Sequence, residues 1–209
     1  MAKLESTFKN MLLSLLFISM GMSAALGFVY SLTKEPIEKA NKMKEVQAIT
    51  DVLPEFDNDP TLDIKSVEGL DYYTATKGGE VVGYAVKSYT DKGFSGHFTM
   101  MVGFKPDGSI HNITVLEHKE TPGLGTKMKE PKFKDQFPGK NPGDFKLKVK
   151  KDGGQIDAIT AATISSRAFC DGVQRAYDGY KVNCLPVMKA MQPDSTQADT
   201  TNQTKGGAR

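Results

Sequence analysis

The sequence has few of the residues that build metal sites or disulfide frameworks. Its 209 residues include two cysteines, Cys170 and Cys184, fourteen residues apart. That spacing fits neither a zinc finger nor a disulfide-dense scaffold, and it indicates two ordinary thiols or one disulfide. The histidines, His97, His111 and His118, lack the i, i+4 pairing of a helical zinc site. We therefore expect no metal centre.

The sequence also lacks an excess of charge of one sign. Lysine and arginine number 27 and aspartate and glutamate 25, which gives a net charge of +2. Such a balance does not build the strongly positive field with which proteins attract nucleic acid, so no nucleic-acid partner is expected. The mean hydropathy of -0.37 averages an apolar N-terminal segment with a lysine-rich remainder. The length suits one compact core.

One long uncharged run lies near the N-terminus. Residues 10–33 contain no charged side chain and are dense in Leu, Met, Ile, Phe, Ala and Val. As a helix rising about 1.5 Å per residue, this run crosses a hydrocarbon core of about 30 Å once. A cleaved signal peptide is the alternative, because a charged start and an apolar centre precede small residues at 23–25. The run continues past them through Leu32, which favours a retained transmembrane helix.

The chain is expected to have four parts. Residues 1–33 form a cytoplasmic start and the transmembrane helix, and residues 34–52 form a stalk helix with Pro36 in its first turn. Residues 53–192 form one compact domain. Residues 193–209 hold no apolar side chain larger than alanine and are expected to be disordered, because they cannot bury enough surface to offset the cost of ordering.

β-Branched and aromatic residues dominate the first half of the domain. Residues 71–90 and 96–118 each surround a glycine-containing turn, at residues 78–79 and 106–108 respectively. This pattern predicts two β-hairpins.

The second half of the domain is expected to mix helix and strand. The sequence predicts a short helix over Pro131 to Phe137, a strand over Phe145 to Val149, and a helix of about five turns from Thr163. The last rests on apolar residues at helical spacing: Ile164, Ala168, Val173, Ala176 and Tyr180. The fold class is therefore α+β, with an antiparallel sheet and flanking helices.

Hydroxyl groups and small side chains cluster where the last helix begins. Thr160, Thr163, Ser165 and Ser166 surround a turn made of Ala161 and Ala162. Small residues let a ligand approach the backbone, and the free N–H groups and dipole of a helix start attract an anion. The pattern is typical of a phosphate site at a strand-to-helix junction. Helix capping by Thr160 or Thr163 is the alternative, which these residues alone leave open.

Two motifs carry a resemblance to a known family. The run Asp157 to Thr163, D-A-I-T-A-A-T, resembles the D-x-x-[ST]-[GA]-A-T signature that flavin transferases recognise when they join FMN to a threonine. The run His118 to Gly125, H-K-E-T-P-G-L-G, resembles the H-x-E-T-P-G-L-G loop of the G subunit of the Rnf electron-transport complex. A relative of that protein is the C subunit of the sodium-pumping NADH:quinone reductase. The resemblance spans Phe8 to Tyr180, and the short length favours the Rnf protein.

The resemblance implies a cofactor and a site. FMN would be attached covalently to Thr163 through a phosphoester, and Thr121 or Glu120 would hydrogen-bond the edge of the flavin ring. The implied binding residues are Asp157, Thr160, Ala161, Ala162, Ile164 and Ser165 in the first motif, and Glu120, Thr121, Gly123, Leu124 and Gly125 in the second. Position 161 is alanine where glycine is common. From its residues alone, the segment 93–96 is a weaker candidate, in which Phe94 stacks on the ring or belongs to the core.

The resemblance also implies a function, partners and a location. The chain would relay electrons as one component of an ion-translocating ferredoxin:NAD⁺ oxidoreductase, inactive alone, with the other subunits, the membrane and a flavin transferase as partners. Its flavin domain would face the periplasmic or outer side of a bacterial cell membrane. The four lysines in residues 34–44 favour the opposite orientation, but that rule weakens before a long translocated domain.

Two other interpretations stay open. One is the C subunit of the sodium-translocating NADH:quinone reductase. The other is a non-catalytic, membrane-anchored binding protein in which Thr163 merely caps a helix.

Overall fold

The protein is described by a computed structural model that covers residues 7–186, and the expected disordered tail, residues 193–209, lies outside this range. The chain divides into two units, residues 1–45 and residues 46–209, which are described separately. Helix α1, Phe8–Val52, runs through the boundary between them. The transmembrane and stalk helices expected as separate elements are therefore one helix. Pro36 lies inside it, where proline removes one backbone hydrogen bond and bends a helix without necessarily ending it.

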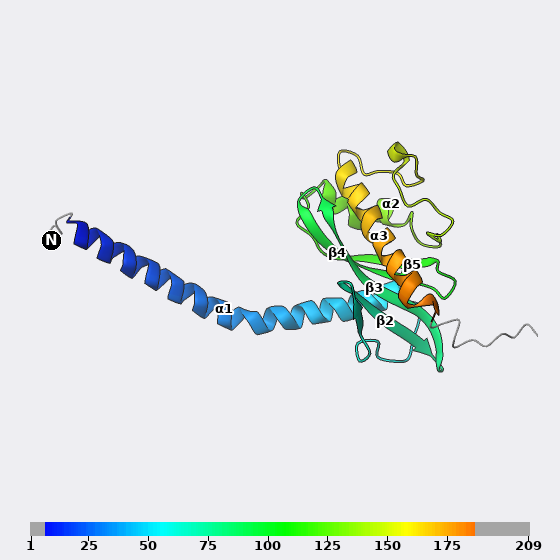
Figure 1. The fold of residues 1–209 in the computed structure, drawn as a ribbon, viewed down its shortest axis with the longest axis horizontal. Coiled ribbons are helices and arrows are strands. Elements are labelled where there is room, and N and C mark those ends of the chain that lie inside the picture. The colour runs from blue at the N-terminus through cyan, green and yellow to red at the C-terminus, as the bar shows by residue number, and fades with distance from the viewer. Residues whose placement is uncertain (1–6, 187–209) are drawn as a thin grey trace, which may run out of the picture. The chain divides into compact units, whose positions relative to one another are not determined.

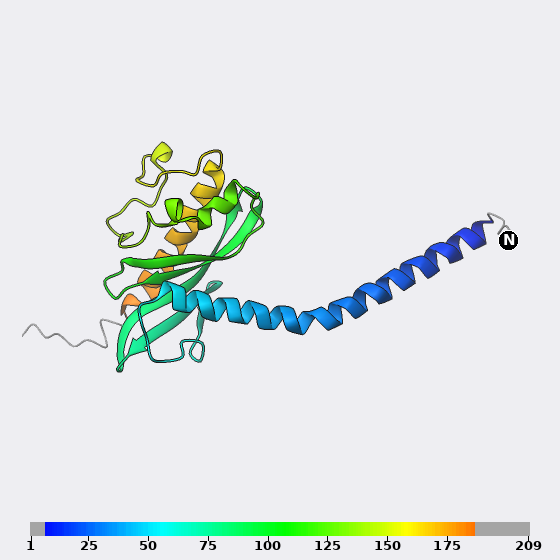
Figure 2. The same ribbon diagram turned by 180° about the vertical axis from the view of Figure 1, so that it is seen from behind.

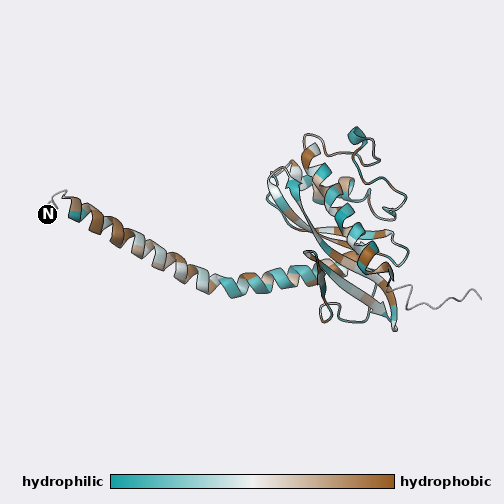
Figure 3. Ribbon diagram, in the orientation of Figure 1, coloured by the Kyte–Doolittle hydropathy of each residue, from teal (hydrophilic) through white to brown (hydrophobic). Residues whose placement is uncertain are grey.

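The N-terminal half of α1 is apolar on all sides. Figure 3 shows brown concentrated in the part of α1 nearest the N-terminus, whereas the part toward the C-terminal end of the helix is mainly teal. Leu15 and Phe28 are 71% and 66% exposed, and other large apolar side chains of this half are similarly bare. Among the described residues, α1 is the helix long and apolar enough to cross a membrane. Lipid is the solvent in which such exposure carries no penalty.

The second unit is built on an antiparallel sheet whose strands follow chain order (Figure 1). The strands are β1 (Lys65–Val67), β2 (Leu70–Lys77), β3 (Glu80–Gly93), β4 (Gly96–Phe104) and β5 (Ile110–Glu117). The two expected hairpins are confirmed as the β2–β3 and β4–β5 pairs. The short strand β1 was not expected. It pairs with β2 at the edge of the sheet.

The two faces of the sheet pack against different elements. Helix α3 (Thr163–Asn183) covers one face, and residues 48–53 cover the other, as Figures 1 and 2 show from opposite sides. Side chains on β4 alternate accordingly: Met100 and Val102 belong to the core beneath α3, and Met101 belongs to the core beneath residues 48–53. The α+β class is confirmed, and the expected helix start at Thr163 is correct.

The segment between β5 and α3 holds little regular structure. It contains the short helices η1 (Gly125–Lys129), α2 (Pro131–Lys134) and η2 (Lys150–Asp152). The helix expected over residues 131–137 therefore ends three residues early. The strand expected over residues 145–149 is wrong: its buried–exposed alternation is real, but only Val149 finds a partner, in an isolated bridge with Ile156.

Candidate functional site

The turn before α3 is held by a serine inside the helix. Ser166 Oγ accepts a hydrogen bond from the Ile159 N–H at 2.9 Å and donates to the Ala162 carbonyl at 3.0 Å. Ala161 is left-handed, with φ 62°, a conformation that costs a non-glycine residue about 1–2 kcal/mol. The segment directly before this turn is not a regular strand, so the expected strand-to-helix junction is wrong. The chain reaches α3 from the isolated bridge at Ile156.

Helix α3 begins without a side-chain cap. Its N-cap residue is Ala162, so capping by Thr160 or Thr163 is wrong. The first N–H groups of a helix have no partner within the helix, and those of Thr163, Ile164 and Ser165 meet no acceptor within residues 7–186. No acidic residue lies in this first turn. The helix start therefore offers unused donors and a positive dipole end to an anion.

Glu120 connects three separate segments from a buried position. Only 4% exposed, it accepts a hydrogen bond from Ser165 Oγ at 2.7 Å and another from the Ser95 N–H at 3.1 Å. Two glycines make room for it. A Cβ on Gly93 would lie 2.6 Å from one carboxylate oxygen, and a Cβ on Gly125 would lie 2.5 Å from the other. Both oxygens are thus engaged within the protein, which leaves Thr121 better placed than Glu120 for the ring edge.

The loop after Glu120 is a tight turn. Gly123 has φ 74°, and its N–H donates to Thr126 Oγ1 at 2.9 Å. His118, the first residue of this motif, has a pKa lowered by burial and by the nearby Lys129, although Glu120 opposes that shift. The shift therefore favours the neutral form of this imidazole at pH 7.

The two sequence motifs meet in one cavity of about 310 Å³. Its lining residues are Phe94, Glu120, Thr121, Leu124, Gly125, Ala161, Ala162, Thr163, Ile164 and Ser165. Nine of the twelve residues expected to bind the cofactor are among them, and Phe94, the weaker candidate, is the tenth. A volume of this size lies at the lower end of the range for ligand pockets. We call it the motif cavity.

Three expected binding residues do not line the motif cavity. Gly123 shapes the loop instead. Asp157 and Thr160 line a neighbouring hollow of about 170 Å³, beside Lys127 and Lys132. Both residues are exposed, and the Asp157 carboxylate forms an ion pair with Lys150 at 2.7 Å.

The rim of the motif cavity is apolar and exposed. Phe94, Leu124 and Ile164 expose 66%, 41% and 47% of their surface. They come from the β3–β4 turn, the loop after Glu120 and the first turn of α3, three segments remote in sequence. Such a rim suits a planar aromatic group that enters only part-way.

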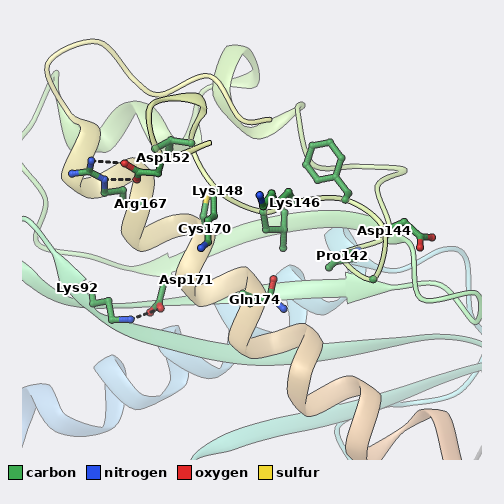
Figure 4. Close-up of a pocket in the computed structure, with 14 residues that line it drawn as sticks. Lys92, Pro142, Asp144, Lys146, Lys148, Asp152, Arg167, Cys170, Asp171 and Gln174 are labelled. Atoms are coloured by element: carbon green, nitrogen blue, oxygen red, sulfur yellow. Dashed lines mark hydrogen bonds and ion pairs between the residues drawn. The ribbon is translucent and has the colours of Figure 1, made fainter. Parts of the chain in front are cut away.

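A larger cavity of about 780 Å³ lies between residues 142–149 and α3. Two of its three acidic side chains are paired: Figure 4 shows Arg167 bound to Asp152 through two hydrogen bonds of 2.7 Å, and Lys92 bound to Asp171. The larger cavity contains no residue of either motif. We therefore assign the candidate site to the smaller motif cavity, because chemistry rather than size identifies a site.

Known proteins resemble this chain over most of its length. A family model described as an FMN-binding domain matches residues 93–178, a range that includes every residue lining the motif cavity. The G subunit of an ion-translocating oxidoreductase complex from Aliivibrio fischeri is 31% identical, over 85% of this chain and 92% of that protein.

Two further proteins are similar to this chain to different degrees. The G subunit of the Na⁺-translocating ferredoxin:NAD⁺ oxidoreductase complex of Acetobacterium woodii is 34% identical, over 81% of this chain and 89% of that protein. The crystal structure of NqrC from Shewanella oneidensis is 23% identical with a TM-score of 0.44, and the match covers 66% of this chain and 70% of that one.

Proposed function

The chain belongs to the family of G subunits of ion-translocating oxidoreductase complexes, and on this premise we propose that it carries FMN covalently on Thr163 and relays electrons within such a complex. Membership of the family makes it a flavin-binding electron-transfer subunit that works beside other subunits. The covalent bond and its position are the parts that the proposal adds.

One observation carries the proposal: Thr163 lines a cavity in which both motifs meet, and its hydroxyl is not used to cap α3. The interpretation of the chain as a binding protein requires that capping role for Thr163. A half-buried threonine beside uncapped N–H groups is instead suited to hold a phosphate ester on its hydroxyl.

The residues of the cavity divide between the two ends of the cofactor. The N–H groups of Thr163, Ile164 and Ser165 would bind phosphate oxygens at the helix start, where the dipole favours negative charge. Ala161 and Ala162 keep the turn small, so that the backbone is accessible there. Bound FMN would supply the redox chemistry, accepting and releasing one or two electrons.

The apolar rim would hold the ring end. Phe94, Leu124 and Ile164 present exposed carbon atoms around the cavity, which would exclude water from part of an isoalloxazine ring. Thr121 lines the same wall and offers a hydroxyl to the ring edge. Because the cavity is small, part of the ring would stay accessible to a partner.

Maturation would require a flavin transferase. Asp157 and Thr160 lie outside the motif cavity and are exposed, so they are accessible to an enzyme that approaches Thr163 from the side of the neighbouring hollow. This placement accounts for motif residues that do not touch the proposed cofactor site.

Helix α1 would anchor the protein in the membrane, with the flavin domain on the periplasmic or outer side. The apolar exposed half of α1 supports the anchor. The orientation is carried over from the family. A reporter active only outside the cytoplasm, fused to the C-terminus, should be active, and activity of a cytoplasmic reporter at that position would overturn the orientation.

Intact mass measurement tests the attachment site. The wild type, co-expressed with a flavin transferase, should gain the mass of one FMN phosphoester and fluoresce in a denaturing gel. Thr163→Ala should show neither property. Thr121→Ala, which removes another hydroxyl from the same cavity, is the matched control and should keep the adduct. An adduct on Thr163→Ala would show that the site is wrong, and its absence from the wild type would contradict covalent attachment.

A further inference from the structure

The small net charge of the chain hides a strong segregation of charge. Residues 119–151 contain ten lysines and four acidic residues, a net charge of +6 in a chain whose total is +2. The remaining residues therefore carry a net charge of -4. We call residues 119–151 the lysine-rich segment. Its charge is large enough to produce a local positive potential, which the near-neutral total conceals.

Most of this charge is not neutralised within the protein. Of the four acidic residues in the segment, Glu120 is buried and bonded to Ser165, so it does not project outward. The following lysines of the segment form no ion pair within residues 7–186: Lys119, Lys127, Lys132, Lys134, Lys140, Lys146 and Lys148. Unpaired surface charges act over about one Debye length, roughly 8–10 Å at physiological salt.

The lysine-rich segment borders the proposed flavin site on one side. It supplies one wall of the motif cavity through Thr121, Leu124 and Gly125. It also lines the neighbouring hollow and the larger cavity. In Figure 4, Lys146 and Lys148 lie on the loop that faces α3, without the ion pairs that occupy Lys92 and Arg167.

We propose that the lysine-rich segment, together with the apolar rim of the motif cavity, is the docking surface for an acidic face of a redox partner protein. The inference rests on the proposed function, because it takes the motif cavity as the flavin site. Apolar side chains at the centre and charges around them are the usual arrangement of a protein interface. The lysines would accelerate the encounter and orient the partner toward the flavin.

A protein face fits these observations better than a lipid surface. A membrane lying on the lysine-rich segment would cover the motif cavity, which belongs to the same surface, and would block the access that electron relay requires. The larger cavity, about 780 Å³ between the segment and α3, would also receive a protruding side chain of a protein partner. A flat layer of headgroups has no such protrusion.

Small redox ions probe the charge around the flavin. Full-length flavinylated protein in neutral-lipid nanodiscs is reduced and then reoxidised by ferricyanide, an anion, or by tris(phenanthroline)cobalt(III), a cation. Each reduced FMN gives one electron to each of two oxidant ions and releases two protons. Raising the ionic strength from ~0.01 to ~0.2 M should slow the reoxidation of the flavin by ferricyanide at least about threefold. The same change should accelerate its reoxidation by the cobalt complex. Equal responses of the two oxidants would overturn the proposal.

A matched pair of double variants locates the effect. In the double variant Lys119→Gln/Lys127→Gln, the rate of reoxidation by ferricyanide should lose at least about half of its dependence on ionic strength. Lys65→Gln with Lys181→Gln removes the same charge elsewhere and should retain it. Lys181 lies 18 residues after Thr163 on α3, about 27 Å along the helix axis. If both double variants lost the ionic-strength dependence equally, the attraction of ferricyanide would not come from the lysine-rich segment.

A binding measurement separates this inference from the proposed function. Thr163→Ala protein, without flavin, should bind a fluorescein-labelled decaglutamate peptide, measured by anisotropy, and the Lys119/Lys127 double variant should bind it at least about threefold more weakly. Unchanged binding would overturn the docking surface, even if the wild type carries FMN. Displacement of the peptide by phosphatidylglycerol in the nanodiscs would identify lipid as the occupant and would also overturn it. A wild type without FMN contradicts only the proposed function, since the peptide result still stands.

Discussion

Glu120 holds the motif cavity together, and its replacement should reveal how strongly. Its carboxylate is the shared acceptor for Ser95 on the β3–β4 turn and Ser165 on α3. Glu120→Ala removes both hydrogen bonds and leaves the two donors without their acceptor. Glu120→Gln keeps the shape: its amide oxygen can accept from the Ser95 N–H, and its NH₂ group can donate to Ser165 Oγ.

The magnitudes of the two changes differ enough to be measured. Hydrogen bonds to a charged group contribute about 1.5–3 kcal/mol each. We take the lower value for both bonds and expect Glu120→Ala to lower the free energy of unfolding by about 3 kcal/mol. At about 2–4 °C per kcal/mol, the midpoint of unfolding falls by about 6–12 °C. Glu120→Gln should lower the free energy of unfolding by less than about 1 kcal/mol.

Thermal unfolding of the full-length protein in detergent, followed by circular dichroism, measures both variants. Glu130→Gln, an exposed position in the same segment, is the control for the change in charge and should melt like the wild type. The reasoning is refuted if Glu120→Ala melts within about 2 °C of the wild type, because a shift that small corresponds to a loss of less than about 1 kcal/mol. It is also refuted if Glu120→Gln is as damaging as Glu120→Ala, since charge alone would then matter.

Two further predictions follow from titratable groups away from the motif cavity. Burial raises the pKa of both Cys170 and Cys184 to about 12, so neither thiol should react with Ellman's reagent at pH 8 in the folded protein, and both should react after denaturation. Burial also raises the pKa of Asp171, but hydrogen bonds from a lysine and a threonine outweigh it and leave the pKa below 3.8. A depressed pKa contributes stability above 3.8 that is lost as pH falls through the folded value. Asp171→Asn should therefore lower the unfolding midpoint by about 2–4 °C at pH 7, and the difference from the wild type should shrink below pH 3.8.

The parts of the fold that were predictable depend on local signals. Glycine-containing turns at residues 78–79 and 106–108 determine the two hairpins, and the apolar spacing after Thr163 determines α3. The strand expected at residues 145–149 failed for a physical reason. Alternation places Leu147 and Val149 in the core, but strand formation also requires a neighbouring strand, which the local pattern cannot show.

The site shows the same division between local and distant information. The hydroxyl cluster near Thr163 was visible in the sequence, yet the residue that stabilises the turn is Ser166, through Ile159, rather than a threonine cap. Phe94 remained a weak candidate because nothing near it in the sequence indicates a site. It reaches the motif cavity because the β3–β4 turn packs against Glu120, a contact 25 residues distant in sequence.

The packing around Glu120 has an evolutionary consequence. A Cβ on Gly125 would meet both the carboxylate and the Cβ of Glu120, whereas a Cβ on Gly93 would meet the backbone carbonyl of Gly96 before it met the carboxylate. A lineage that adds a side chain at position 125 must therefore also replace Glu120 or pass through a poorly folded intermediate, whereas replacing Glu120 does not make room at position 93. Among relatives of this protein, positions 120 and 125 should therefore change together, position 93 should stay glycine, and a sequence that keeps the acid but carries alanine at position 125 should be rare.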